Sequence, residues 1–139
     1  MGIVERTIRS WQERRVELNP PASAADLQTL GHLLRREIPN DVRDFYLYAN
    51  GMPAHVYDQH EVSFWSIPKI REECAESQEK MVGFADFLIY SWRFLFAVDE
   101  SGVTIMTENV PPGSPVEALG SFSEFLQRYE ANPCDLGVL

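Results

Sequence analysis

The segment that most constrains this chain of 139 residues runs from position 19 to position 51, with the sequence NPPASAADLQTLGHLLRREIPNDVRDFYLYANG. After its double proline, Ser23 is a good N-cap for a helix, and Asp26 lies three residues later, near the positive end of the helix dipole. Leucines then recur at helical spacing, so we predict a buried face and an end at Ile38-Pro39, because proline cannot continue a helix. These leucines are Leu27, Leu30, Leu33 and Leu34.

A second, shorter helix is predicted directly after this break. Proline fits the first turn of a helix, where its missing N–H does no harm, so Pro39 opens the helix and Asn50-Gly51 supplies a left-handed stop. Gly31 in the preceding helix costs up to about 1 kcal/mol relative to alanine, which suggests close packing against another element. The buried face expected for the second helix comprises Val42, Phe45, Tyr46 and Ala49.

The first residues of the chain are typical of an amphipathic helix. Over residues 2–17, Val4, Ile8 and Trp11 recur at spacings of four and three, which places them on one helical face. The Asn19-Pro20-Pro21 run is expected to stop this helix, because proline restricts the residue before it and cannot continue a helix.

The rest of the chain alternates between strand-like and helical patterns. The density of Phe, Tyr and Trp over residues 84–98 favours strands, and residues 99–102 are typical of a hairpin loop. Ser121 and Glu124 form the S-x-x-E pattern of a capping box, which predicts a final helix that Pro133 ends. The remaining predicted elements are a strand at 62–65, a polar helix at 68–80, a returning strand at 103–107, a loop at 109–115 and a strand at 116–119.

This order of elements predicts an α+β fold. Hairpin-type connections favour a mainly antiparallel sheet, with helices at the N-terminus, in the middle of the chain and at the C-terminus. Helices should cover one face of that sheet, and the other face could be partly open. A chain of this length is most simply one domain over residues 1–139.

The charge of the protein is strongly acidic and unevenly distributed. The formal net charge is −9, and residues 1–50 contribute nothing to it because seven basic and seven acidic side chains cancel. Residues 51–139 hold five basic and fourteen acidic side chains. Phosphate binding depends on Lys and Arg, so we expect no direct contact with nucleic acid. A protein partner with a basic face is one interpretation of this charge, and solubility is the other.

No catalytic or metal-binding motif stands out in the sequence. There is no G-x-S-x-G elbow, no phosphate-binding loop and no cysteine with a histidine-bearing signature. His55, Asp58 and His60 lie close together, but their spacing matches no standard metal motif. We therefore expect no enzyme activity, no cofactor and no metal.

The cysteine content and the hydropathy of the sequence indicate the cellular compartment of the protein. Cys74 and Cys134 are the only two cysteines, and their spacing is neither that of a disulfide framework nor that of a zinc site. Free thiols in a reducing compartment are the favoured interpretation. Because no apolar run is long enough for a membrane helix and the N-terminus lacks a signal-like apolar core, we expect a cytoplasmic protein without membrane contact.

A series of short motifs resembles the SUKH superfamily, whose members carry the Smi/Knr-type domain. The order and spacing of these motifs along most of the chain carry the resemblance. Ile38 stands where the family more often has leucine, and residues 52–60 lack the additional glycines expected after Asn-Gly. The motifs are Pro21-Ala22-Ser23 with Leu27 and Leu30, Ile38-Pro39-Asn40-Asp41, Phe45-Tyr46-Leu47, Asn50-Gly51, Phe64-Trp65-Ser66-Ile67, Phe84-Ala85-Asp86, Trp92-Arg93-Phe94 and Ser121-Phe122-Ser123-Glu124-Phe125-Leu126.

The resemblance implies an α+β domain without known catalytic activity. Bacterial members are predominantly immunity proteins that are encoded beside a toxin, often a nuclease or deaminase, and bind it. The fungal type member regulates cell-wall synthesis and signalling through protein contacts. The sequence therefore predicts a toxin-neutralising binding protein first and a regulatory or scaffolding module second, with a small-ligand binder or enzyme as a third alternative.

A binding patch can be sketched from the acidic half of the chain. Acids in loops or at strand ends would speed association with a basic toxin, and an aromatic anchor would slow dissociation. Trp65, Tyr90 and Trp92 are expected to be partly exposed, because their polar atoms suit wet edges. The predicted partner-binding residues are Asp58, Glu61, Trp65, Asp86, Asp99 and Glu100.

Overall fold

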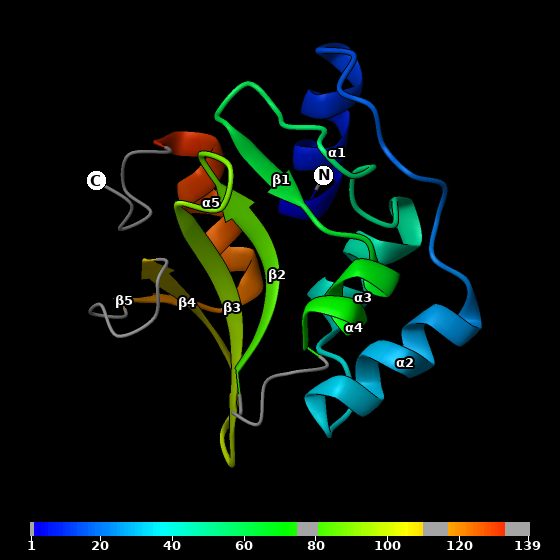
Figure 1. Ribbon diagram of the computed structural model, residues 1–139, viewed down its shortest axis with the longest axis vertical. Coiled ribbons are helices and arrows are strands. Elements are labelled where there is room, and N and C mark those ends of the chain that lie inside the picture. The colour runs from blue at the N-terminus through cyan, green and yellow to red at the C-terminus, as the bar shows by residue number, and fades with distance from the viewer. Residues whose placement is uncertain (1, 75–80, 110–116, 133–139) are drawn as a thin grey trace.

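A computed structural model describes residues 2–74, 81–109 and 117–132 of the chain, without the side chains of residues 109 and 117. Within these residues the protein forms five helices and five strands. Figure 1 shows how they are arranged. They are α1 (Ile3–Glu13), α2 (Ala24–Leu34), α3 (Asn40–Tyr48), β1 (Val62–Phe64), α4 (Ile67–Cys74), β2 (Met81–Phe87), β3 (Trp92–Asp99), β4 (Gly102–Asn109), β5 (Glu117–Gly120) and α5 (Phe122–Ala131).

The strands form one antiparallel sheet in the order β1-β2-β3-β4-β5, so the predicted α+β class is confirmed. The predicted hairpin loop is also confirmed, because Asp99 of β3 pairs with Gly102 of β4. The aromatic run is two strands, β2 and β3, joined by a turn at residues 88–91. Figure 1 places this β2–β3 turn and the β3–β4 turn at opposite ends of the sheet.

Both predicted capping boxes are present. The hydroxyl oxygen of Ser23 accepts the backbone N–H of Asp26 at 3.1 Å, and the Asp26 carboxylate accepts the backbone N–H of Ser23 at 3.2 Å. Ser121 and Glu124 make the same reciprocal pair at the start of α5. Each box satisfies two N–H groups that a helix start leaves without partners, which explains why these helices begin where the sequence predicts.

The ends of the first two helices differ from the prediction. The helix α1 ends at Glu13 and α2 ends at Leu34, before the prolines that were expected to stop them. Arg35 takes a left-handed conformation (φ 57°), and its N–H donates to carbonyl groups of the last turn of α2. Close packing does not explain Gly31, because an added Cβ would lie 3.7 Å from the nearest atom, an ordinary contact distance.

Asn50-Gly51 joins three parts of the fold rather than stopping α3. The helix already ends at Tyr48, since Ala49 is extended. The side chain of Asn50 donates to Asp26 at 3.2 Å and accepts the N–H of Ile67, the first residue of α4, at 2.8 Å. The predicted left-handed conformation of Gly51 is present (φ 66°), but it brings the backbone against the next strand instead of capping the helix.

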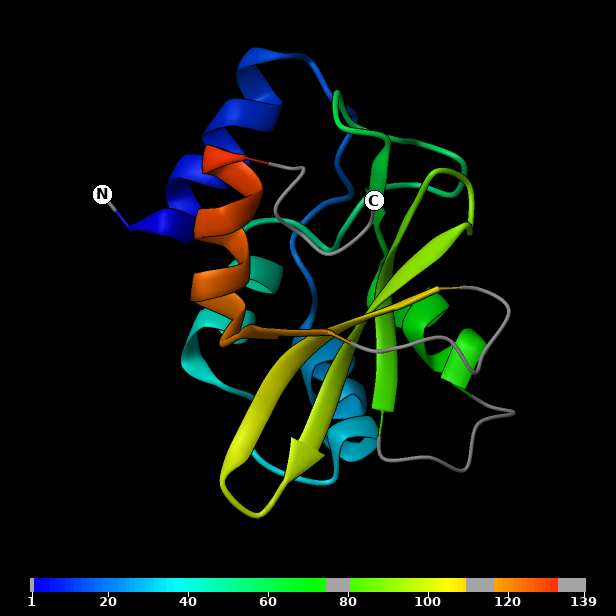
Figure 2. The same cartoon turned by 90° about the vertical axis from the view of Figure 1, so that its left-hand side faces the viewer.

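The helices α1, α3 and α5 lie together on one side of the sheet, as Figure 2 shows. The helix α5 packs against β4, β5, α1 and α3, and aromatic side chains fill the space between helices and sheet. Phe84 of β2 stacks on Phe96 of β3 with ring centroids 4.3 Å apart, and both contact Phe122. The buried faces predicted for α1 and α3 enter this core, as does the face of α5 that carries Phe122, Phe125, Leu126 and Tyr129.

The opposite face of β2 is covered by α4 and by Trp65, which directly follows β1. The helix α4 contacts both β2 and α2. Cys74, at the end of α4, is half-buried and has a free thiol, whereas Cys134 lies outside the described residues, as do residues 75–80 of the predicted polar helix and most of the loop predicted at 109–115. Among the described residues, none of the helices has the length and hydropathy that crossing a bilayer requires.

Candidate interaction surfaces

Asp58, one of the predicted partner-binding residues, is only 6% exposed, and its carboxylate accepts hydrogen bonds inside the protein. Its Oδ2 accepts the indole N–H of Trp11 on α1 at 3.1 Å and the hydroxyl of Tyr129 on α5. Its Oδ1 accepts the backbone N–H groups of His60 at 2.8 Å and Val62 at 3.1 Å. Burial raises the pKa of Asp58 to about 6, although the hydrogen bonds from Val62, His60 and Trp11 act in the opposite direction.

Trp65 and Asp86 are also buried, each with an exposed fraction of 0%. The expectation that Trp65 is partly exposed is wrong, because its indole ring lies over Gly83 of β2 and against the ring of Tyr90. The Trp65 indole N–H donates to Asp86 Oδ2 at 2.7 Å. Asp86 Oδ1 accepts the Tyr57 hydroxyl at 2.7 Å and the Tyr90 backbone N–H at 3.2 Å. Both side chains are therefore buried and hydrogen-bonded within the protein, and they are not free to touch a partner.

The other predicted partner-binding residues are exposed, but they do not form one surface. Asp99 and Glu100 lie at the β3–β4 turn, while Glu61 lies beside the β2–β3 turn at the other end of the sheet. Asp99 is engaged in its own turn, since its carboxylate accepts the hydroxyl and N–H of Ser101 and the N–H of Gly102. These hydrogen bonds, led by the Ser101 hydroxyl, hold the pKa of Asp99 below its usual value.

The histidine-containing loop offers little for a metal. In the described part of the chain, His, Cys, Asp and Glu side chains do not gather in any group of three or more that could hold an ion. Asp58 faces the interior, and the His60 ring packs edge-on against Tyr129 at 5.2 Å. Burial lowers the pKa of His60, and nearby Arg14 lowers it further.

Large exposed hydrophobic side chains occur as two adjacent pairs in the described ranges. Leu47 and Tyr48 at the end of α3, here called the helix pair, are 48% and 47% exposed. Leu88 and Ile89 in the β2–β3 turn, here called the turn pair, are 38% and 74% exposed. Sequence reasoning missed both. The helix pair could have been found, because it falls off the predicted buried face of its helix, whereas the turn pair is hidden inside a continuous apolar run.

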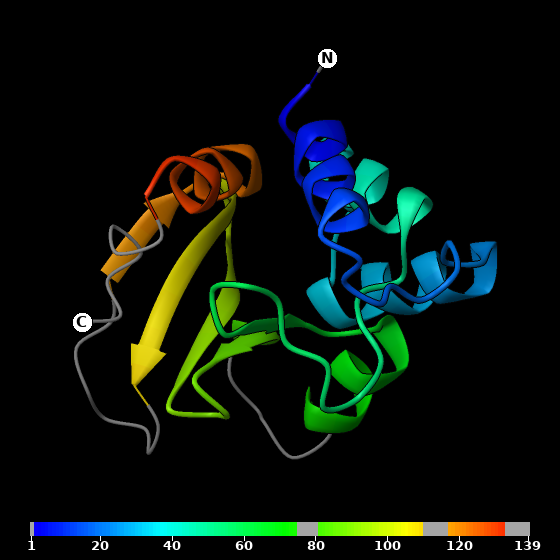
Figure 3. The same cartoon turned by 90° about the horizontal axis from the view of Figure 1, so that it is seen from above.

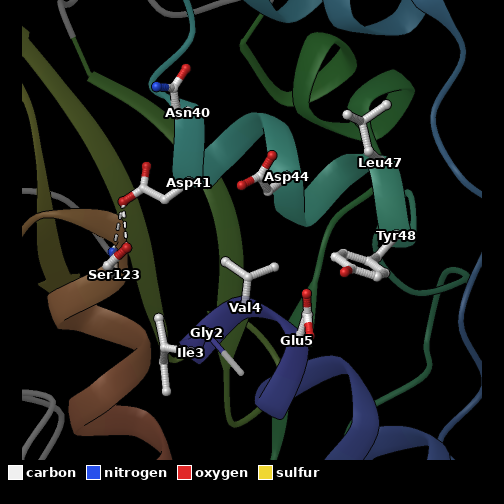
Figure 4. A pocket seen from close by; sticks show the side chains of 10 residues that line it. All are labelled: Gly2, Ile3, Val4, Glu5, Asn40, Asp41, Asp44, Leu47, Tyr48 and Ser123. Carbon is white, nitrogen blue, oxygen red and sulfur yellow. Dashed lines mark hydrogen bonds between the residues drawn. The ribbon is translucent and has the colours of Figure 1, made fainter.

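The helix pair borders a groove of about 620 Å³ between the start of α1, α3 and the start of α5, here called the α1–α3 groove. Figure 4 shows its side chains, with Glu5 and Tyr48 facing each other across it and Asp44 between the two helices. The groove combines apolar side chains with three carboxylates. It is lined by Gly2, Ile3, Val4, Glu5, Asn40, Asp41, Asp44, Leu47, Tyr48 and Ser123.

The carboxylates of the groove differ in what they can offer a ligand. Asp41 is committed to the fold, because one oxygen accepts the N–H and hydroxyl of Ser123 at 2.9 and 2.8 Å and the other accepts the N–H of Val42. Glu5 and Asp44 are exposed. The hydrogen bond to Glu5 raises the pKa of Tyr48, and the negative charges of Glu5 and Asp44 add to the effect. The groove therefore presents negative charge beside exposed apolar surface.

The turn pair has an unusual backbone. Leu88, Ile89 and Tyr90 all have positive φ, at 52°, 51° and 66°. A β-branched residue such as isoleucine rarely adopts this region, because its side chain clashes with the backbone. The N–H of Leu88 donates to the carbonyl of Glu61 at 3.0 Å, and the N–H of Tyr90 donates to Asp86, so both ends of the turn are fixed.

No protein-family model and no curated protein matches this chain. The resemblance to the SUKH superfamily therefore stays an interpretation of the sequence motifs, and the fold and the two exposed pairs are the structural basis for a functional proposal.

Proposed function

We propose that the protein is a non-catalytic binding domain that docks on another protein with a basic surface. The observation that carries this proposal is that exposed apolar pairs occur near acidic residues on two separate surfaces. The helix pair borders a groove lined by Glu5 and Asp44, and the backbone of Leu88 in the turn pair bonds to that of Glu61, an exposed acidic residue. Apolar anchors that exclude water slow dissociation, and surrounding charges speed encounter with a partner of opposite sign.

The partner proposed in particular is a bacterial toxin domain of nuclease or deaminase type, which this protein would neutralise as an immunity protein. The resemblance to the SUKH superfamily supports this choice. The acidic excess of residues 51–139 supports it independently, because a nuclease needs a basic groove for its substrate and an acidic surface can shield that groove. The engagement of Asp58 and Asp86 by protein donors supports structural rather than catalytic roles for both.

Co-expression with the product of the neighbouring gene tests the proposal. We expect that product to arrest growth alone, to be neutralised by this protein, and to form a stoichiometric complex with it in size-exclusion chromatography. The association rate should fall steeply as salt rises, because opposite charges steer the encounter. A neighbouring product that is harmless, or that this protein neither binds nor neutralises, would contradict the immunity role. Binding to a signalling or cell-wall protein instead would favour the regulatory alternative.

A further inference from the structure

The β2–β3 turn holds three successive residues in the left-handed region without a glycine, Leu88, Ile89 and Tyr90. Each such residue is strained, because its side chain lies too close to the backbone, and strain of this kind persists only where the surrounding structure enforces it. A two-residue Asn-Gly turn would join two antiparallel strands without that cost. The strain therefore needs an explanation beyond chain reversal.

A buried hydrogen-bond network holds the backbone of the turn in this conformation. Asp86 accepts hydrogen bonds from the Tyr90 backbone, the Tyr57 hydroxyl and the Trp65 indole, and it is itself fully buried. The carbonyl of Glu61 fixes the other end through the Leu88 N–H. A backbone held in one conformation before binding loses little conformational entropy on binding, so these hydrogen bonds make the turn a preorganised element.

The turn displays apolar surface at its tip and aromatic surface on its flank. Ile89 is the most exposed of the large hydrophobic side chains in the described residues, at 74%. Tyr57 and Tyr90 are partly exposed beside it. The ammonium group of Lys69 lies 5.1 Å from the ring centroids of both Trp65 and Tyr90, which fixes the flank of the turn.

The charged groups around the turn are mostly negative. Glu73 accepts the hydroxyl of Tyr90 at 3.2 Å. Burial raises the pKa of Tyr90, and the negative charges of Glu73 and Glu72 raise it further. Burial also raises the pKa of Tyr57, and the negative charge of Glu61 adds to that effect. Of the described cations, Lys69 lies over the aromatic rings beside the turn, and Arg93 is paired with Glu108.

We infer that the turn pair is the main anchor for the partner and inserts into an apolar pocket edged by Arg or Lys side chains. This inference rests on the proposed function and specifies which surface performs it. Figures 2 and 3 show that the β2–β3 turn lies away from α1 and α3, so the α1–α3 groove is a separate surface. A second copy of this chain is a poor occupant, because its own acidic groups would face those around the turn.

Binding measurements with two matched variants test this inference. The probe is the purified product of the neighbouring gene, catalytically inactivated, titrated into the full chain by isothermal titration calorimetry. Ile89→Asp places a charge at the tip of the turn, and Leu47→Asp makes the same kind of change in the α1–α3 groove. We expect Ile89→Asp to weaken binding by at least about 30-fold, the size of a hot-spot loss, and Leu47→Asp by less than about 5-fold.

Ile89→Ala provides a milder variant if the aspartate destabilises the turn, and thermal unfolding followed by circular dichroism verifies that each variant folds. We expect Ile89→Ala to weaken binding by about 10-fold. Binding of the wild-type chain that neither Ile89 variant weakens would overturn the anchor but leave the proposed function intact. No binding by the wild-type chain would overturn both. A wild-type dimer that Ile89→Asp converts to a monomer would replace the proposed partner with a second copy.

Discussion

The indole N–H of Trp11 donates to the carboxylate of Asp58 at 3.1 Å across 47 residues of sequence. The same indole donates to the hydroxyl of Tyr129 at 2.9 Å, and that hydroxyl donates to Asp58. Three side chains from α1, α5 and the loop before β1 thus close a buried polar triangle. A polar group in the core is stabilising only when its hydrogen bonds are made, so the triangle ties the loop to both helices.

The pH dependence of stability should report the burial of Asp58. Its pKa of about 6 in the folded protein lies above its usual value of 3.8, so the folded state binds a proton more tightly than the unfolded state. The stability contributed by this group is therefore greatest below about pH 4, falls by roughly 3 kcal/mol as pH rises from about 4 to about 6, and is lost above that. Urea unfolding of the wild-type chain and of Asp58→Asn at several pH values measures the effect.

The difference in unfolding free energy between the wild type and Asp58→Asn isolates the effect of the titration of Asp58. Other groups that titrate in the same range, such as His60 and Glu130, contribute to both proteins. The wild type minus variant difference should fall between pH 4 and pH 7. A difference that stays flat or rises over this range would show that Asp58 is not held above its usual pKa.

The hydrogen bonds of the triangle should be energetically coupled. Trp11→Phe and Tyr129→Phe each remove a donor to Asp58 and should each lower the free energy of unfolding by about 1–3 kcal/mol. Because the two side chains share a partner and bond to each other, the double variant should lose less than the sum of the single losses. Additive losses in a double-mutant cycle by urea unfolding would indicate that the two donors act independently.

Local features of this fold were predictable from the sequence, and long-range ones were not. The capping boxes at Ser23 and Ser121 depend on residues three positions apart, so the pattern alone gives them. The burial of Trp65 depends on the register that places Phe64 opposite Ala85, and on a carboxylate 21 residues away. Nothing near Trp65 in the sequence indicates which face of the sheet it covers.

The predicted binding patch failed to assemble for the same reason. The position of Asp58 in a polar loop predicts a surface acid, but its partners Trp11 and Tyr129 are 47 and 71 residues away. Asp99 and Glu61 share a charge sign but lie at opposite ends of the sheet. Composition indicates an acidic surface, whereas only the strand topology determines which acids are neighbours.

Two glycines should respond in opposite ways to alanine. Gly51 has a positive φ of 66°, and an added Cβ would lie 2.5 Å from the backbone carbonyl of Trp65, so Gly51→Ala should lower the unfolding free energy by more than about 2 kcal/mol. Gly31 lies inside α2 with ordinary contact distances, so Gly31→Ala should raise it by up to about 1 kcal/mol. Thermal or urea unfolding distinguishes the two variants, and equal effects would contradict the description of both sites.

Strain in the β2–β3 turn can be measured by comparing two small residues at position 89. Ile89→Ala and Ile89→Gly both remove a side chain that is 74% exposed, so little buried surface is lost in either variant. Alanine retains the penalty for a positive φ, whereas glycine adopts this region freely. We expect Ile89→Gly to be more stable than Ile89→Ala by about 1 kcal/mol in urea unfolding, although glycine ordinarily lowers stability by making the unfolded chain more flexible. If alanine is the more stable of the two, then the turn is not strained at this position, and the preorganised conformation inferred for the turn pair is wrong.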